Sequence, residues 1–259
     1  RGDWQAALPA LRVVSSAAGE GLKPSIKRQH VALLYLDALN GQASDASAII
    51  SAGNDSVVRA FKGLQATLKV APEFWPAAKC LAGLHLGAKL PRKAAKVLES
   101  AFRAMPHKEL AELLETTWQV NDGEVVSRLN ALIPDVGPTV DEAACIVGEV
   151  ALAHDLPGET RRLLGQIPEE RRDAATWRLA AHLADAERDF EAANKALQLA
   201  GEAPRSRRWQ CTSCQLIHEF WQSHCGGCAG FATLEWRRPD GITPLPSAVG
   251  NLVGDLVLD

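Results

Sequence analysis

Residues 211–228 read CTSCQLIHEFWQSHCGGC, and this stretch limits how the C-terminal part of the chain can fold. It holds two CxxC motifs, Cys211 with Cys214 and Cys225 with Cys228, and ten residues separate them. Each motif forms a turn that brings two thiolates close together, and two such turns supply the four sulfurs of a tetrahedral site. The spacing therefore predicts one Zn²⁺ per chain in a closed site, which is structural rather than catalytic.

The alternatives to zinc are two disulfides, four separate thiols, or iron in place of zinc. His218 and His224 flank the motifs, but four sulfurs already complete a tetrahedron. Paired CxxC motifs that must stay reduced to hold a metal survive best in a reducing compartment. We therefore expect this region in the cytosol or on the cytoplasmic side of a membrane.

The composition is that of a globular protein, with 259 residues, 47% of them hydrophobic and 23% charged. We expect a helical repeat domain over residues 1–204, a four-cysteine ribbon over residues 205–240 and a tail over residues 241–259. The formal net charge of −3 provides no field that would attract nucleic acid or an anionic membrane. A nucleic-acid partner is therefore not expected.

The first 204 residues carry amphipathic helical patterns separated by Pro and Gly, with almost no alternating strand pattern, which predicts an all-α domain. Pro72 and Pro106, which lie 34 residues apart, each follow a predicted helix. A repeat of this size is typical of the tetratricopeptide (TPR) helical hairpin, which stacks into a solenoid. Small and apolar residues recur in a 33-residue register as Ala82, Ala94, Leu98 and Ala101, then Gly148, Thr160, Leu164 and Ile167, then Ala181, Ala193, Leu197 and Ala200.

Other segments are helical but less regular. Residues 108–134 do not keep the register of small residues. Residues 25–39 and 55–70 are predicted to pair as a hairpin, with residues 41–53 as an inserted connection. Residues 1–18 are predicted to be the second helix of a truncated repeat, so further helices are expected before Arg1.

Two stretches resemble the TPR region of alphaproteobacterial HemY-type proteins: residues 74–82 (FWPAAKCLA) and residues 90–111 (LPRKAAKVLESAFRAMPHKELA). The C-terminal part is also similar to the segment that closes those proteins, through Trp209-Gln-Cys, Trp221, the second CxxC motif and residues 231–239 (FATLEWRRP). The resemblance implies a bacterial inner-membrane protein with two N-terminal transmembrane helices and a cytoplasmic TPR domain. It also implies an association with haem biosynthesis.

The architecture is also similar to that of LapB-type proteins, which join TPR repeats to a rubredoxin-like ribbon and regulate lipopolysaccharide assembly. Only the architecture and the cysteine spacing carry this second resemblance. Rubredoxin turns usually place Gly directly after the second Cys of each pair, whereas this chain has Gln215 and Ala229 there.

The sequence holds no phosphate-binding loop, dinucleotide fingerprint, HExxH motif or nucleophile elbow, so we expect a non-enzymatic scaffold for protein–protein interaction. Lys79, Arg178 and His182 lie on the first helices of predicted repeats and are candidates to contact a peptide partner. Cys80 and Cys145 are expected in the core. A LapB-type regulator, a rubredoxin-like electron carrier and a porphyrin-binding module remain the alternatives, and no other small-molecule ligand is expected.

Overall fold

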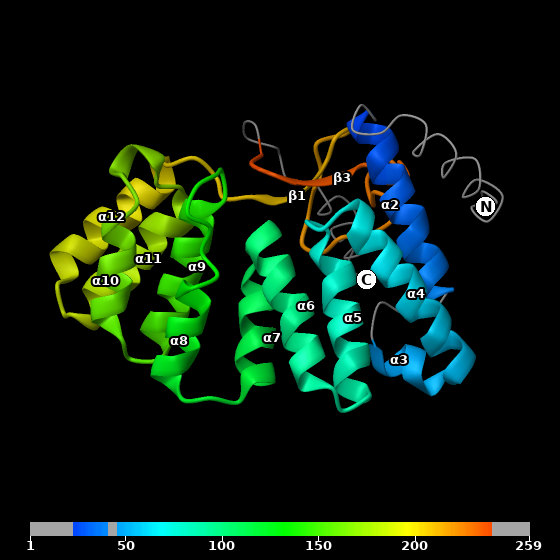
Figure 1. The fold of residues 1–259 in the computed structure, drawn as a ribbon. Helices are drawn as coiled ribbons and strands as arrows, with labels where there is room; N and C mark the ends of the chain where they lie inside the picture. Colours follow the sequence, from blue (N-terminus) through cyan, green and yellow to red (C-terminus); the bar gives the residue numbers. More distant parts are fainter. Residues whose placement is uncertain (1–22, 41–45, 240–259) are drawn as a thin grey trace, which may run out of the picture. The chain divides into compact units, whose positions relative to one another are not determined.

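The computed structural model describes residues 23–40 and 46–239, and the chain divides into two compact units between Pro204 and Arg205. The described part of the first unit is helical, and the second unit holds a small sheet (Figure 1). The α-helices are α2 (Pro24–Leu39), α3 (Ala46–Ser51), α4 (Asn54–Val70), α5 (Trp75–Gly87), α6 (Pro91–Ala104), α7 (Lys108–Trp118), α8 (Asp122–Asn130), α9 (Val140–Ala153), α10 (Pro157–Gly165), α11 (Ala174–Ala186) and α12 (Phe190–Glu202), with a short 3₁₀ turn, η2 (Glu169–Arg171).

Three hairpins, α5 with α6, α9 with α10 and α11 with α12, are closed by the same kind of turn. In each turn one residue adopts a left-handed conformation: Lys89 (φ 57°), Asp155 (φ 55°) and Arg188 (φ 63°). The residue after it donates its N–H to a carbonyl near the end of the first helix, as in Leu90 to His85, 2.9 Å. Such bonds satisfy carbonyls that a helix end leaves free. Because the three turn residues fall on the 33-residue register, the hairpins repeat in conformation as well as in sequence.

Small residues sit where paired helices meet, as the sequence predicts. The register positions from Ala82 to Ala101 and from Gly148 to Ile167 are buried. Thr160 is fully buried, and its hydroxyl donates to the Gly148 carbonyl at 3.0 Å across the α9–α10 hairpin. Leu197, at the corresponding register position of the last hairpin, is instead 51% exposed. This residue lies on α12, the last helix of its unit, so no following helix of that unit covers it.

The irregular segments are helical too. Residues 108–134 contain α7 and α8, which bury Leu110, Leu114 and Leu129. The expected connection between α2 and α4 is not only a loop, because it contains α3. Gly83 and Gly87 of α5 lie one turn apart and leave room for Ala46 and Ile50 of α3. The predicted first helix over residues 1–18 and the tail over residues 241–259 lie outside the described residues.

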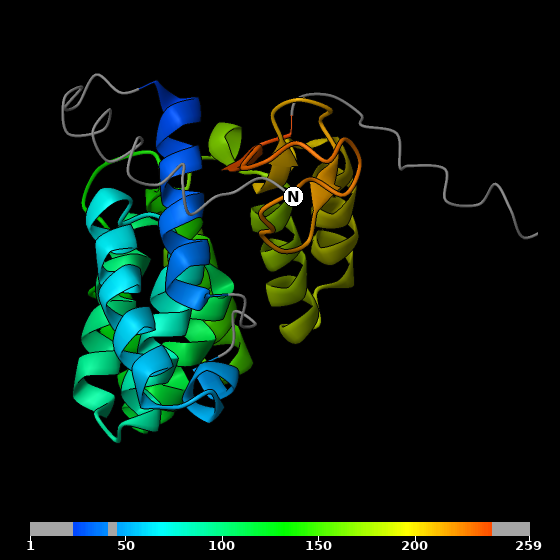
Figure 2. The same cartoon turned by 90° about the vertical axis from the view of Figure 1, so that its right-hand side faces the viewer.

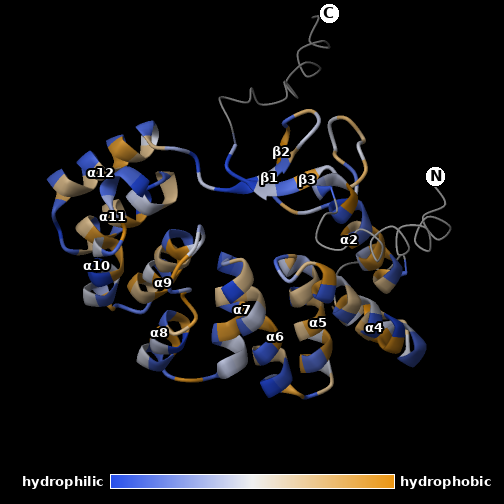
Figure 3. Ribbon diagram, turned by 45° about the horizontal axis from the view of Figure 1, so that its top comes forward, coloured by the Kyte–Doolittle hydropathy of each residue, from blue (hydrophilic) through white to orange (hydrophobic). Residues whose placement is uncertain are grey.

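Alternate helices of the first unit contact one another in series. α5 contacts α7, α7 contacts α9, and α9 contacts α11. We call these four helices the first-helix row. α2 lies along α4 in both side views (Figures 1 and 2). The helices carry both hydrophobic and hydrophilic residues, as expected where one side is covered by neighbours (Figure 3). Among the described residues, no helix has the length and apolar character needed to cross a membrane.

The second unit holds a three-stranded antiparallel sheet in the order β2–β1–β3. Its strands are β1 (Arg208–Cys211), β2 (Ile217–His218) and β3 (Leu234–Arg237). Trp209 and Trp236 are directly paired across β1 and β3, and their rings meet edge to face at 5.5 Å. Such a pair adds about 0.5–1.5 kcal/mol beyond the area that it buries.

The α2–α4 contact depends on a glycine. A Cβ added at Gly63 would lie 2.5 Å from the Cβ and 2.9 Å from the Cα of Ala38, so backbone as well as side chain would have to move. We expect Gly63→Ala to lower the free energy of unfolding by about 1–2 kcal/mol, despite the better helix propensity of Ala. Gly201→Ala is the control, since a Cβ there meets nothing within 4 Å. Urea titration followed by circular dichroism measures both, and equal stability of the two variants would contradict this packing.

Candidate metal centre

The first CxxC motif begins where β1 ends. The Cys211 N–H donates to the Leu216 carbonyl at 2.9 Å, and the Gln215 N–H donates to the Cys211 carbonyl at 3.0 Å. These two bonds fold the chain back on itself, so that Cys211 and Cys214 project from one tight turn. Gln215 closes the turn in a left-handed conformation (φ 64°).

The second motif repeats this geometry. The Cys225 N–H donates to the Gly230 carbonyl at 3.0 Å, and the Ala229 N–H donates to the Cys225 carbonyl at 2.9 Å. Ala229 is left-handed (φ 55°), like its counterpart Gln215. A residue with a side chain in this conformation costs roughly 1–2 kcal/mol, which is why Gly usually occupies such positions. The two turns therefore keep the geometry of a metal-binding turn without the glycine that relieves its strain.

The two turns bring all four sulfur atoms within 4.8 Å of one another. Cys211 Sγ lies 3.7 Å from Cys228 Sγ, and Cys214 Sγ lies 3.4 Å from Cys225 Sγ. Both distances are far longer than the roughly 2.05 Å of a disulfide bond. They are close to the edge of about 3.8 Å expected for a tetrahedron with Zn–S bonds of about 2.3 Å. The four cysteines can thus hold one metal ion such as zinc.

Hydrogen bonds to sulfur favour thiolates at two of the four ligands. The Ser213 and Cys214 N–H groups donate to Cys211 Sγ at 3.4 and 3.5 Å, and the Gly227 N–H donates to Cys225 Sγ at 3.4 Å. The Thr233 hydroxyl lies 3.2 Å from Cys211 Sγ. Hydrogen bonds to the charged form stabilise it, so these contacts prepare the sulfurs to bind a cation.

The pKa values of two thiols diverge. Burial alone would raise the pKa of Cys211, but its hydrogen bonds with Thr233, Cys214 and Ser213 lower it to about 6. The backbone of Leu216 favours the Cys214 thiolate, but desolvation and the other three cysteines raise the pKa of Cys214 to about 12. One thiolate therefore forms readily, and its negative charge opposes ionisation of the next thiol. A divalent cation removes this repulsion, because it makes all four sulfurs ligands at once.

The surroundings of the cluster are crowded on one side. Cys211 and Cys225 are buried, whereas Cys214 and Cys228 are exposed. A Cβ at Gly227 would lie 2.9 Å from Leu216 Cδ2. Another at Gly230 would lie 2.8 Å from Thr233 Cγ2. The two glycines therefore permit Leu216 and Thr233 to pack closely beside the cysteine cluster.

Neither flanking histidine belongs to the cluster of four sulfurs. His218 Nε2 lies 3.3 Å from Cys225 Sγ, and its Nδ1 lies 2.6 Å from Gln222 Nε2. His224 Nδ1 instead lies 3.1 Å from Ser223 Oγ. Burial lowers the pKa of His218, so its ring is neutral near pH 7 and can donate one hydrogen bond to a ligand sulfur.

The three residues expected to contact a partner are all exposed, but they do not form one cluster. Lys79 on α5 pairs with Glu109 on α7 at 2.5 Å. Arg178 and His182 lie one turn apart on α11. His182 is close enough to Glu149 of α9 to favour its carboxylate, although burial, the larger effect, raises the pKa of Glu149. Helices α7 and α9 of the first-helix row separate Lys79 from the other two.

Cys80, Cys145 and His154, a histidine that could be considered for a porphyrin-binding module, have structural surroundings. Cys80 and Cys145 are 1% and 5% exposed, as predicted, and burial strongly raises the pKa of Cys145. His154 Nε2 lies 2.7 Å from a carboxylate oxygen of Glu115, and its Nδ1 lies 3.1 Å from Asp122. Both ring nitrogens of His154 thus already face carboxylates.

Sequence reasoning missed Thr233, which lies 22 residues from Cys211 but contacts its sulfur. A hydroxyl residue between the second CxxC motif and the last strand is too common a feature to be singled out by itself. Sequence reasoning also missed that Gln215 and Ala229 adopt the left-handed conformation, for which glycine is expected.

No protein-family model matches the chain. Among curated proteins, the probable magnetosome protein Mms48 of Magnetospirillum gryphiswaldense is similar to it, with 29% identity over 149 residues. The aligned part is 56% of this chain and 33% of that protein. The chain thus spans about a third of the length of this relative, and the similarity concerns part of each protein.

We expect Cys225→Ser to abolish metal binding and unfold the second unit, because metal binding in small Cys-rich domains contributes about 10–16 kcal/mol. The helices of the first unit should persist. Far-ultraviolet circular dichroism reports the helices, and the fluorescence of Trp209 and Trp236 together with limited proteolysis reports the ribbon. Cys80→Ala, which removes a buried thiol of the first unit, is the control and should keep the ribbon folded. Loss of all helical signal in Cys225→Ser would contradict the division into two units.

We expect Thr233→Val to release the metal at higher pH than the wild-type protein does. Protons compete with the metal for sulfur, and loss of the hydroxyl raises the pKa of Cys211, so the midpoint of release should rise by about half to one pH unit. A chromogenic chelator follows release as the pH is lowered. Thr212→Val is the control, since its hydroxyl donates to the Thr233 carbonyl rather than to sulfur. Identical midpoints for the two variants would show that the Thr233 hydroxyl does not act on the thiolate.

Proposed function

We propose that the protein is a non-enzymatic scaffold in which TPR-like hairpins form a short solenoid and bind a segment of a partner protein. The observation that carries this proposal is the first-helix row, in which α5, α7, α9 and α11 contact one another in series. In solenoids of helical hairpins, such a row lines the extended surface that binds partners. The common turn of Lys89, Asp155 and Arg188 supports a true repeat.

The first-helix row offers charges of both signs to a partner. Lys79 and Glu109 pair between α5 and α7, while Glu149 and His182 lie near each other on α9 and α11. Arg178 is exposed one turn from His182, and its side chain has no ion pair or hydrogen bond within the described residues. An acidic group of a peptide could pair with Arg178. A second acidic group could replace Glu109 as the ion-pair partner of Lys79. Exposed pairs of this kind contribute only about 0.2–1 kcal/mol each, so such exchange is easy.

The second unit is proposed to be a rubredoxin-like ribbon that binds structural zinc. Four cysteines in two matched turns support this assignment. Zinc fits better than an electron-transferring iron because Gln215 and Ala229 replace the glycines typical of rubredoxin turns. The ribbon would then stabilise the C-terminal end of the protein and take no part in a reaction.

We further propose that the chain is the cytoplasmic region of a bacterial inner-membrane protein of the HemY type, with a role linked to haem biosynthesis. The resemblance of residues 74–82, 90–111 and 231–239 supports this placement. The similarity to a probable magnetosome protein favours a second candidate location, the magnetosome.

The scaffold proposal is tested by the triple variant Lys79→Ala, Arg178→Ala, His182→Ala in pull-downs from detergent-solubilised membranes. We expect wild-type protein to capture a specific partner, and the variant to bind that purified partner at least tenfold more weakly. The control variant Lys69→Ala, Arg103→Ala, Lys195→Ala removes exposed cations from α4, α6 and α12, outside the first-helix row. It should bind as wild type does.

Two results would contradict the proposal. Wild-type protein could recover no partner beyond those of a bead control. Alternatively, both triple variants could bind the partner equally well, which would place binding elsewhere on the molecule.

A further inference from the structure

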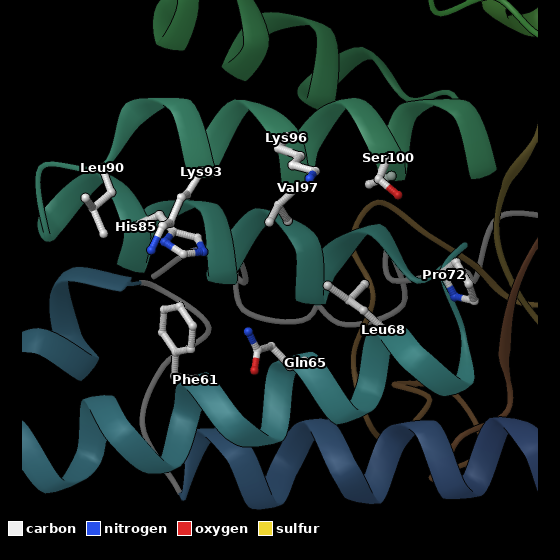
Figure 4. Close-up of a pocket in the computed structure, with 11 residues that line it drawn as sticks. Phe61, Gln65, Leu68, Pro72, His85, Leu90, Lys93, Lys96, Val97 and Ser100 are labelled. Carbon is white, nitrogen blue, oxygen red and sulfur yellow. The ribbon is translucent and has the colours of Figure 1, made fainter.

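A pocket of about 470 Å³ lies between α4, α5 and α6 of the first unit (Figure 4). Its volume is within the range of roughly 300–1,000 Å³ that is usual for small-molecule sites. The walls are mainly apolar, with Phe61 and Leu68 on α4, and Val97 and Ala101 on α6, while Gln65 and Ser100 add polar side chains. Phe61 and Leu68 are two helical turns apart, so the pocket extends for about 10 Å along α4. No sequence pattern indicates this pocket, because three helices create it together.

The charge of the pocket is all of one sign. Lys93 and Lys96 line it from the same helix, α6, and are neighbours on one face. Both are exposed, and within the described residues neither side chain has a hydrogen bond or an ion pair. α6 also has no acidic residue in its first turn, so nothing there offsets the partial positive charge of the helix start. An anion at this end of the pocket would meet two cations and a favourable helix dipole.

His85 supplies a polar group inside the pocket. Its side chain projects from α5, is 6% exposed, and meets the Phe61 ring edge to face at 4.8 Å. Its Nδ1 is buried and has no hydrogen-bond partner within the described residues. A buried polar atom without a partner costs about 1–3 kcal/mol, and a ligand that hydrogen-bonds to it would recover this energy. Figure 4 shows the imidazole beside Lys93, at the end of the pocket where Leu90 lies.

Burial lowers the pKa of His85, and the charge of Lys93 lowers it further. The ring is therefore neutral near pH 7, so that it offers one N–H donor and adds no charge. The two lysines therefore favour an anionic ligand by their charge. The histidine favours a head group that can form a hydrogen bond with its ring.

We propose that this pocket binds a small amphipathic carboxylate, with its head group between Lys93, Lys96 and His85 and its apolar body along Phe61, Leu68 and Val97. The ligand has to be apolar because the walls are, and anionic because both charged groups of the pocket are cations. The site is separate from the first-helix row, since α4 and α6 supply most of its lining. The protein would thus combine a partner-binding surface with a site that senses or carries an acidic apolar metabolite.

Isothermal titration calorimetry with decanoate, below its micellar concentration, tests the proposal on the full chain. We expect saturable binding of one decanoate per chain. Lys93→Gln with Lys96→Gln should weaken the affinity at least tenfold. The matched control, Lys62→Gln with Lys69→Gln, removes two exposed lysines of α4 that do not line the pocket and should bind as wild type does. Circular dichroism checks that every variant is folded.

Two further arms separate the contributions to binding. Decyltrimethylammonium has an apolar chain only one carbon longer and carries a positive charge, and it should not bind saturably. His85→Phe keeps an aromatic ring on Phe61 and removes Nδ1, so we expect a weakening of several-fold. The triple variant of Lys79, Arg178 and His182 should bind decanoate normally, which distinguishes this site from the proposed partner surface.

The proposal is overturned if decanoate gives no saturable binding. It is equally overturned if the cationic analogue binds as tightly as decanoate, because the pocket would then be only an apolar depression. Equal affinity of both double lysine variants would also overturn it.

Discussion

Four sulfur atoms within 4.8 Å of one another cannot all be thiolates unless a cation lies among them. This constraint governs the second unit, where a three-stranded sheet and two tight turns supply little apolar core. The same repulsion between thiolates is reflected in the pKa values, which fall to about 6 for Cys211 and rise to about 12 for Cys214. A metal ion bound by the four sulfurs would remove this repulsion and stabilise the fold in one step. The strained conformations of Gln215 and Ala229 persist because the cluster and the hydrogen bonds of both turns hold them in place.

The first unit depends on a different constraint, the close approach of helices. Gly63 meets Ala38, Gly83 meets Ala46, and the buried Thr160 bonds to the Gly148 carbonyl. Such contacts bring backbones together and leave long polar side chains on the outside. The same principle leaves exposed charges on the first-helix row and, between α4 and α6, a pocket that packing does not fill. The two proposed binding sites thus lie where the close contact between helices ends or is left open.

The sequence was informative where its signals were local. The CxxC spacing identified the four sulfurs, and the 33-residue register located Ala82, Gly148 and Ala181 in helix contacts. It did not indicate that Leu197 is exposed, since a register cannot show that no further helix follows in the unit. It overlooked α3, whose six residues give too short a pattern to distinguish from a loop. Thr233 and the pocket around His85 were beyond reach, because both depend on contacts between distant segments.

The most direct test of the metal centre is elemental analysis of protein purified without added metal, with reactive thiols counted on the same sample. The chain has six cysteines. If zinc holds the ribbon together, the protein contains one zinc per chain, and four thiols become reactive only after a chelator removes it. Protein without metal, in which these four thiols react at once while the tryptophan environment of the ribbon is unchanged, would contradict the account. Iron in equal amount would contradict the assignment of zinc and restore electron transfer as the function of the ribbon.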